Sequence, residues 1–145
     1  MSTDTINQAL QTANGTIVAH IDAIEATIKE RTALKYERDE LLMLQDQIRV
    51  ARERELAASF VTEGNKTFLV EDDGTRVPMV ADQRKDWVAQ QVAASEEYAS
   101  FGRRISEKSR RISELDDEYT VLHMRYRAAV IDAEGQIAML RSAMA

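Results

Sequence analysis

The chain has 145 residues, of which 44% are hydrophobic and 30% charged, with a net charge of −6 and no cysteine. The missing cysteines exclude disulfides and thiolate metal sites, and the acidic balance excludes a uniformly basic nucleic-acid binder. No apolar run approaches the roughly 20 residues of a membrane span, and Met1-Ser2-Thr3-Asp4 lacks the features of a signal peptide. We therefore expect a soluble, cytoplasmic protein without membrane contacts.

The first part of the chain favours helix, because the whole sequence contains only 5 glycines and 1 proline. Asn14-Gly15 predicts a break between a short helix over residues 1–15 and a long helix over residues 16–62, with Thr16 as its N-cap. An apolar stripe follows helical spacing and then loses phase between Ile28 and Leu34, which predicts a shifted seam. The stripe consists of Ile17, Ile21, Ile24, Ile28, Leu34, Leu41, Leu44, Ile48 and Ala51.

The connection over residues 63–81 has a different character. Gly64 is suited to a left-handed helix C-cap. Two β-favouring runs, residues 67–70 and 75–80, flank the turn signal Asp72-Asp73-Gly74 and predict a β-hairpin. Pro78 cannot donate a ladder hydrogen bond, so it belongs on an edge or at a strand end.

The last part predicts one long helix over residues 82–143, with Asp82 as N-cap. From Tyr98 onward, 12 of 14 positions in two heptad columns are apolar or aromatic. A sustained period of 3.5 residues predicts a left-handed supercoiled seam. One column is Tyr98, Ile105, Ile112, Tyr119, Tyr126, Ala133 and Leu140, and the other is Phe101, Lys108, Leu115, Leu122, Ala129, Gln136 and Ala143.

The predicted fold class is all-α. We expect a long antiparallel helical hairpin, a coiled coil, with a small β-hairpin at the connection, forming a single elongated domain over residues 1–145. Two helices in contact leave apolar surface exposed, so we also expect a homo-oligomer whose contacts include the seam.

The residue pattern does not favour an enzyme, a metal site or a cofactor. His20 and His123 lie on different predicted helices without ligand spacing, and are expected on the helix surface. Neighbouring carboxylates such as Glu96-Glu97 point apart on a helix. Asp72-Asp73-Gly74 lacks the remaining ligands of a calcium loop. We therefore expect a protein that works through contacts.

A basic ridge is the clearest polar feature. Residues 103–111 contain five basic side chains and one acidic side chain. They are predicted either to pair with acids such as Glu37, Glu40 and Glu53 of the facing helix, or to grip nucleic-acid phosphates. The candidate nucleic-acid-binding residues are Arg103, Arg104, Lys108, Arg110, Arg111, Arg125 and Arg127.

Residues 82–136 resemble the second half of small phage recombination mediators of the UvsY kind. The resemblance rests on Asp82-Gln83-Arg84-Lys85-Asp86-Trp87, then Ala94-Ser95-Glu96-Glu97-Tyr98, and finally Leu115, Met124-Arg125-Tyr126-Arg127 and Ile131-Asp132 in a long heptad helix. It implies an oligomeric accessory protein of phage DNA recombination or replication. Such a protein binds single-stranded DNA and loads a recombinase in place of a single-strand-binding protein, in a bacterial or phage-infected host cell.

Two other hypotheses stay open. Two long helices joined by a β element also resemble prefoldin-type chaperones, in which case the partner is an unfolded protein. The third is a purely structural coiled coil, such as a virion or scaffold component.

Overall fold

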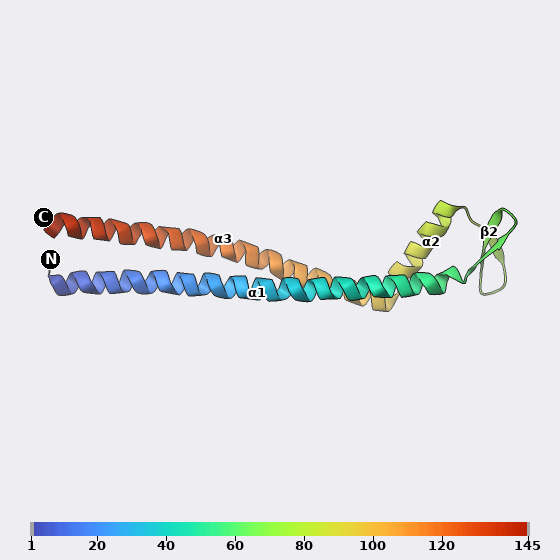
Figure 1. Cartoon of the computed structure of the whole chain (residues 1–145), viewed down its shortest axis with the longest axis horizontal. Coiled ribbons are helices and arrows are strands. Elements are labelled where there is room, and N and C mark those ends of the chain that lie inside the picture. The colour runs from blue at the N-terminus through green and yellow to red at the C-terminus, as the bar shows by residue number, and fades with distance from the viewer. Residues whose placement is uncertain (1, 145) are drawn as a thin grey trace. The chain divides into compact units, whose positions relative to one another are not determined.

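The computed structural model describes residues 2–144. The elements are α1 (Thr3–Ala57), β1 (Phe60–Glu63), β2 (Lys66–Val70), β3 (Arg76–Pro78), α2 (Ala81–Ala94) and α3 (Glu96–Met144). The predicted fold class is confirmed, since the long helices α1 and α3 pack against each other and a small antiparallel sheet forms the connection (Figure 1). Contacts divide the chain into two units, residues 2–36 with 109–144 and residues 37–108.

Helix α1 begins two residues into the chain and runs without interruption to Ala57. Ser2 caps it, because its hydroxyl accepts a hydrogen bond from the backbone N–H of Thr5 at 3.2 Å. The predicted break at Asn14-Gly15, with its separate short helix and Thr16 as N-cap, is wrong. Thr16 instead donates its hydroxyl to the carbonyl of Thr12 at 3.0 Å inside the helix. A single glycine costs a helix only about 1 kcal/mol, which the flanking turns outweigh.

A row of less exposed positions on α1 alternates by four and three residues from Ile6 to Arg52. The predicted phase slip is therefore wrong: Ile21 and Ile28 are 37% and 45% exposed, while Thr27 is only 8% exposed. The seam continues because polar side chains occupy the positions that the apolar pattern leaves empty. It consists of Ile6, Leu10, Ala13, Ile17, His20, Ile24, Thr27, Arg31, Leu34, Arg38, Leu41, Gln45, Ile48 and Arg52.

The sheet has three strands in the order β1-β2-β3. Strand β1, most of which lies within the helix predicted over residues 16–62, therefore extends the predicted hairpin. Strand β1 pairs with β2 from Phe60↔Leu69 to Glu63↔Lys66, across a two-residue loop. Gly64 has a φ of +62° in this loop, and Asn65 has no positive φ, as in a type II′ hairpin turn. Gly64 therefore serves the turn and is not the helix C-cap that we predicted.

The predicted hairpin around Asp72-Asp73-Gly74 is present. Strands β2 and β3 pair antiparallel, with Leu69 opposite Val77 and Phe68 opposite Pro78. Pro78 ends the edge strand β3, where its missing N–H breaks no ladder bond. Gly74 closes the turn with a φ of +84°, a conformation that favours glycine.

The sheet packs against α2 within the unit that comprises residues 37–108. The ring of Phe60 meets the ring of Trp87 edge-on, with centroids 5.4 Å apart and planes at 84°. Leu69 of the sheet, Val92 of α2 and Leu56 of α1 are buried in the same unit. A small apolar core therefore stabilises a sheet that would be marginal alone.

The second predicted helix is two helices, because the chain breaks at Ser95. Ser95 has extended dihedrals, φ −65° and ψ 123°, and separates α2 from α3. Glu96 and Glu97 then occupy the first turn of α3, where the positive end of the helix dipole favours acids. Asp82 lies in the first turn of α2 and not at its N-cap, which is Val80. Gln83 accepts the backbone N–H of Val80 at 3.0 Å.

Candidate interaction surfaces

The heptad columns of α3 form its less exposed face. Leu115 is fully buried and Ile112 is 5% exposed. The other six seam residues named from the sequence are half-buried: Tyr98, Phe101, Ile105, Tyr119, Leu122 and Tyr126. Gln136 is exposed, and Lys108 keeps 34% of its side chain exposed. The apolar columns thus identify the face of α3 that packs within the chain.

In the unit of residues 2–36 and 109–144, α1 and α3 run antiparallel, and the two chain ends lie at the same end of the unit (Figure 1). Arg111 donates to Glu30 at 3.1 Å, and Arg31 of α1 pairs with Asp116 of α3. These contacts cross from one helix to the other, so they fix the register of the pair.

In the unit of residues 37–108, polar contacts again cross between α1 and α3. Lys108 donates to Glu37 at 2.7 Å, and the Gln45 amide donates to the carbonyl of Tyr98 at 3.3 Å. A Cβ added at Gly102 would lie 3.3 Å from Nε2 of Gln45, so the helices approach closely there. Among the polar seam residues of α1 in this unit, Gln45 thus has its partner on α3, whereas Arg38 and Arg52 pair with Asp39 and Glu55 of their own helix.

The basic ridge is largely engaged with acids. Arg103 bonds Glu96 at 2.6 Å, and Arg110 lies 3.9 Å from Glu114. The Arg104 guanidinium stacks over the ring of Phe101 at 5.3 Å. These three arginines of the ridge therefore have partners within α3 itself.

Arg111 is the most heavily engaged residue of the ridge. Besides Glu30 it contacts Glu114 at 3.3 Å and Glu118 at 3.2 Å. The hydrogen bond to Glu30, followed by that to Glu114, raises the pKa of Arg111 above its usual value. Arg49 of α1 shows the same effect, since hydrogen bonds to Asp46 and Glu53 raise its pKa. Of the three facing acids named from the sequence, Glu37 contacts the ridge, whereas Glu53 bonds Arg49 on its own helix.

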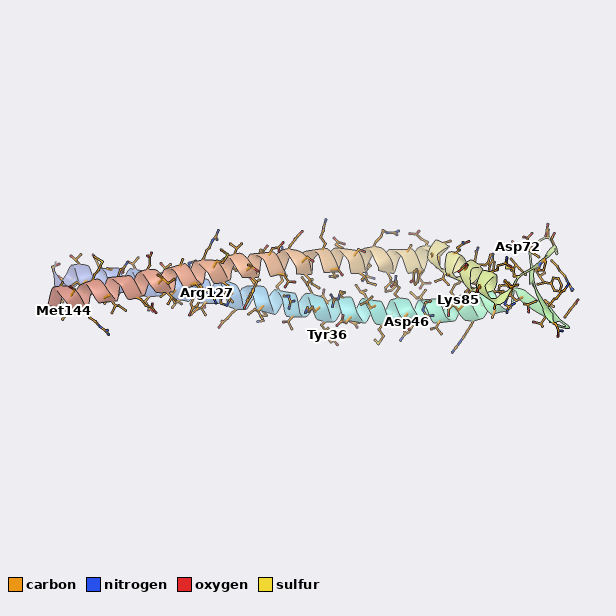
Figure 2. The ribbon with its side chains drawn as sticks, turned by 90° about the horizontal axis from the view of Figure 1, so that it is seen from above. Tyr36, Asp46, Asp72, Lys85, Arg127 and Met144 are labelled. Carbon is orange, nitrogen blue, oxygen red and sulfur yellow. The ribbon has the colours of Figure 1, made fainter. Side chains whose placement is uncertain are left out.

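Arg125 and Arg127, the two candidate nucleic-acid-binding residues outside the ridge, have no such partners among the described residues. Both are exposed, and neither forms an ion pair with another residue of the range 2–144. Figure 2 labels Arg127 on the C-terminal part of α3, where side chains project away from the ribbon. These two arginines are available to a partner.

The histidines lie at half-buried positions, which corrects the expectation of surface histidines. His20 occupies the seam of α1. His123 lies between Tyr119 and Tyr126, with ring centroids 5.3 Å and 6.1 Å apart, both edge-on. Within the described residues, no group of three or more acids or histidines is arranged to hold a metal ion. Between residues 2 and 144, no helix combines the length and apolarity that a membrane span needs.

No family model, curated protein or solved structure matches the chain. The resemblance of residues 82–136 to UvsY-type mediators therefore stays a hypothesis based on the residues that suggested it.

Proposed function

We propose that this chain is a non-enzymatic coiled-coil accessory protein that works by assembling with copies of itself. One observation carries the proposal: large apolar side chains stay exposed on helix faces that the α1–α3 seam does not use. On α1 they include Val18, Ile21 and Ile28, which are 37–45% exposed. On α3 they include Met124, Ile131 and Met139, which are 66–67% exposed.

Single exposed apolar residues are normal on proteins, but a row of them marks a contact surface. The exposed apolar residues of α3 recur at helical spacing, as in Met124 and Ile131, seven residues apart. A second helix that covers such a row removes it from water, at roughly 25 cal/mol for each Å² of apolar surface. Self-association is the simplest way for one chain to gain this burial.

Sedimentation velocity of the full chain over a wide concentration range tests the proposal. We expect masses that are multiples of the 16.4 kDa monomer and that depend on concentration. A particle that stays monomeric at every concentration would contradict the proposal.

Single-stranded DNA is the partner that the UvsY-type resemblance implies, and it is the second candidate. Arg104, Arg125 and Arg127 support it, because none of them forms an ion pair within residues 2–144. The contacts of Arg111 and Lys108 weigh against it, since phosphates would have to displace Glu30 and Glu37. The geometry therefore favours self-assembly over DNA binding as the role of these helices.

Fluorescence anisotropy with a labelled oligonucleotide at two salt concentrations tests this second candidate. Binding through phosphates weakens steeply with salt. Replacement of Arg103, Arg104 and Arg110 by Ala removes ridge charges without breaking an ion pair between the helices, because the ion pairs of Arg103 and Arg110 and the ring contact of Arg104 all lie within α3. The matched control replaces Lys29, Lys66 and Lys85 by Ala. DNA binding that is equal in both variants would exclude the ridge.

A further inference from the structure

An apolar stripe covers the face of α3 opposite its seam. Its six residues alternate by three and four positions and all are exposed, with Val121 at 45%, Met124 at 66% and Ile131 at 67%. This outer stripe consists of Val121, Met124, Ala128, Ile131, Gly135 and Ala138. The spacing is that of a second coiled-coil seam, on the side of α3 that does not face α1.

The outer stripe is complementary to itself when two copies run antiparallel. In one register, Met124 lies opposite Gly135 of the second copy, and by symmetry Gly135 lies opposite Met124. The same register places Val121 opposite Ala138, and Ile131 opposite Ala128. Each large side chain thus faces a small one, which lets two helices approach closely without overlap.

The charges beside the outer stripe select the same orientation. Arg125 and Arg127 lie in its first half, and Asp132 and Glu134 lie in its second half. All four are exposed, and none forms an ion pair within residues 2–144. In an antiparallel pair the two flanks place Arg125 near Asp132 of the second copy and Arg127 near Glu134. A parallel pair would place like charges together, which disfavours it.

Gly135 agrees with this arrangement. Glycine weakens a helix interior relative to alanine. A Cβ at Gly135 would meet no atom within 4 Å in the chain, so packing within the chain does not require a glycine there. A methionine that enters from a second helix does require the space.

We propose that a second copy of this chain packs antiparallel on the outer stripe, with the two-fold axis between Ala128 and Ile131. The inference rests on the proposed self-assembly and names the face, the orientation and the register. The outer stripe has basic residues beside its first half and acidic residues beside its second half. It is therefore complementary to the same stripe of a second chain that runs antiparallel, and this self-complementarity identifies the partner as another copy.

Charge variants test the orientation. The acidic variant carries Arg125→Glu and Arg127→Glu, and the basic variant carries Asp132→Arg and Glu134→Arg. Each variant faces like charges in its own dimer, so we expect its self-association to weaken by roughly tenfold or more. An equimolar mixture of the two variants pairs opposite charges, so we expect association to return. Sedimentation velocity measures both, and circular dichroism checks that the helix content is unchanged.

The matched control for the acidic variant is the double substitution Lys29→Glu and Lys85→Glu. It changes the net charge by the same amount but at positions away from the outer stripe, so it should assemble like the unmodified chain. If the unmodified chain is always monomeric, the proposed self-assembly and this interface both fail. If it assembles and the acidic variant assembles equally well, only the interface fails. Weakened variants that do not recover on mixing would overturn the antiparallel pairing.

Cysteine cross-linking tests the register, because the chain has no cysteine of its own. Chains with Met124→Cys and chains with Gly135→Cys should form a disulfide-linked dimer when mixed and oxidised. Met124→Cys alone should not, since its two thiols would lie about 16 Å apart along the helix axis. Cross-linking of Met124→Cys alone in preference to the mixture would overturn the register.

Discussion

Among residues 2–144, Leu115 is the only large side chain that is completely buried. Its truncation is therefore the sharpest test of the seam. Leu115→Ala removes contacts on all sides and leaves a cavity. Substitutions of this type cost about 2–5 kcal/mol. We expect a value in the lower half of that range, because two helices around one side chain can partly collapse into the space.

Leu42 provides the matched control, since it is the same residue type on α1 but 44% exposed. Leu42→Ala should cost about 1 kcal/mol or less, because part of the side chain already contacts water. Urea unfolding followed by circular dichroism at one fixed protein concentration gives both free energies of unfolding, and the fixed concentration keeps any association constant between variants. Equal losses for the two variants would refute the assignment of the seam.

Three further predictions concern the backbone and the charges. Gly15→Ala should stabilise the chain by about 0.5–1 kcal/mol, because the position is helical and open, whereas Gly64→Ala should destabilise it by about 1–2 kcal/mol because of its φ of +62°. The two variants should therefore shift the thermal melting temperature in opposite directions. A lower melting temperature for both variants would instead support the predicted helix break at Gly15. Glu37→Lys and Lys108→Glu should each lower the melting temperature, and the double variant should recover part of the loss; no recovery would show that the pair does not couple. Hydrogen bonds with Thr75 in the β2–β3 turn lower the pKa of the Asp73 carboxyl group. The contribution of Asp73 to stability is therefore present above the ordinary carboxyl pKa and is lost as the pH falls through the lowered pKa. An NMR titration in which Asp73 protonates at its ordinary pKa would contradict this.

The seam of α3 could be predicted from the sequence, but the seam of α1 could not, and the difference lies in residue types. On α3 the inward positions are mostly apolar, so a hydrophobic pattern identifies them. On α1 the same role falls to Thr27, Arg31 and Gln45, whose polar side chains a hydrophobic pattern does not identify as inward-facing. Thr27 donates to the carbonyl of Ala23, and the other two find their partners on α3.

Strand β1 had a readable signal. Phe60-Val61-Thr62 favours strand, and Gly64-Asn65 between two such runs matches a two-residue hairpin loop. The helix preference of the preceding residues extended the predicted helix to residue 62, whereas α1 ends at Ala57. The break at Ser95 was also readable, because Ser-Glu-Glu is typical of a helix start.

The two faces of α3 use different charged groups to select different partners: the seam selects α1 of the same chain, and the outer stripe is proposed to select a second copy. Along the seam, cross-helix contacts such as Arg111–Glu30 and Arg31–Asp116 are made to the antiparallel helix of the same chain. A seam built solely of apolar side chains would accept helices of other copies in several registers, so polar seam residues give up some stability to select one partner. The outer stripe has no polar residue in its row, and its orientation depends on flanking charges that remain free within the described chain. Because folding satisfies the first set of charges and leaves the second set exposed, assembly should depend more steeply on salt than folding does.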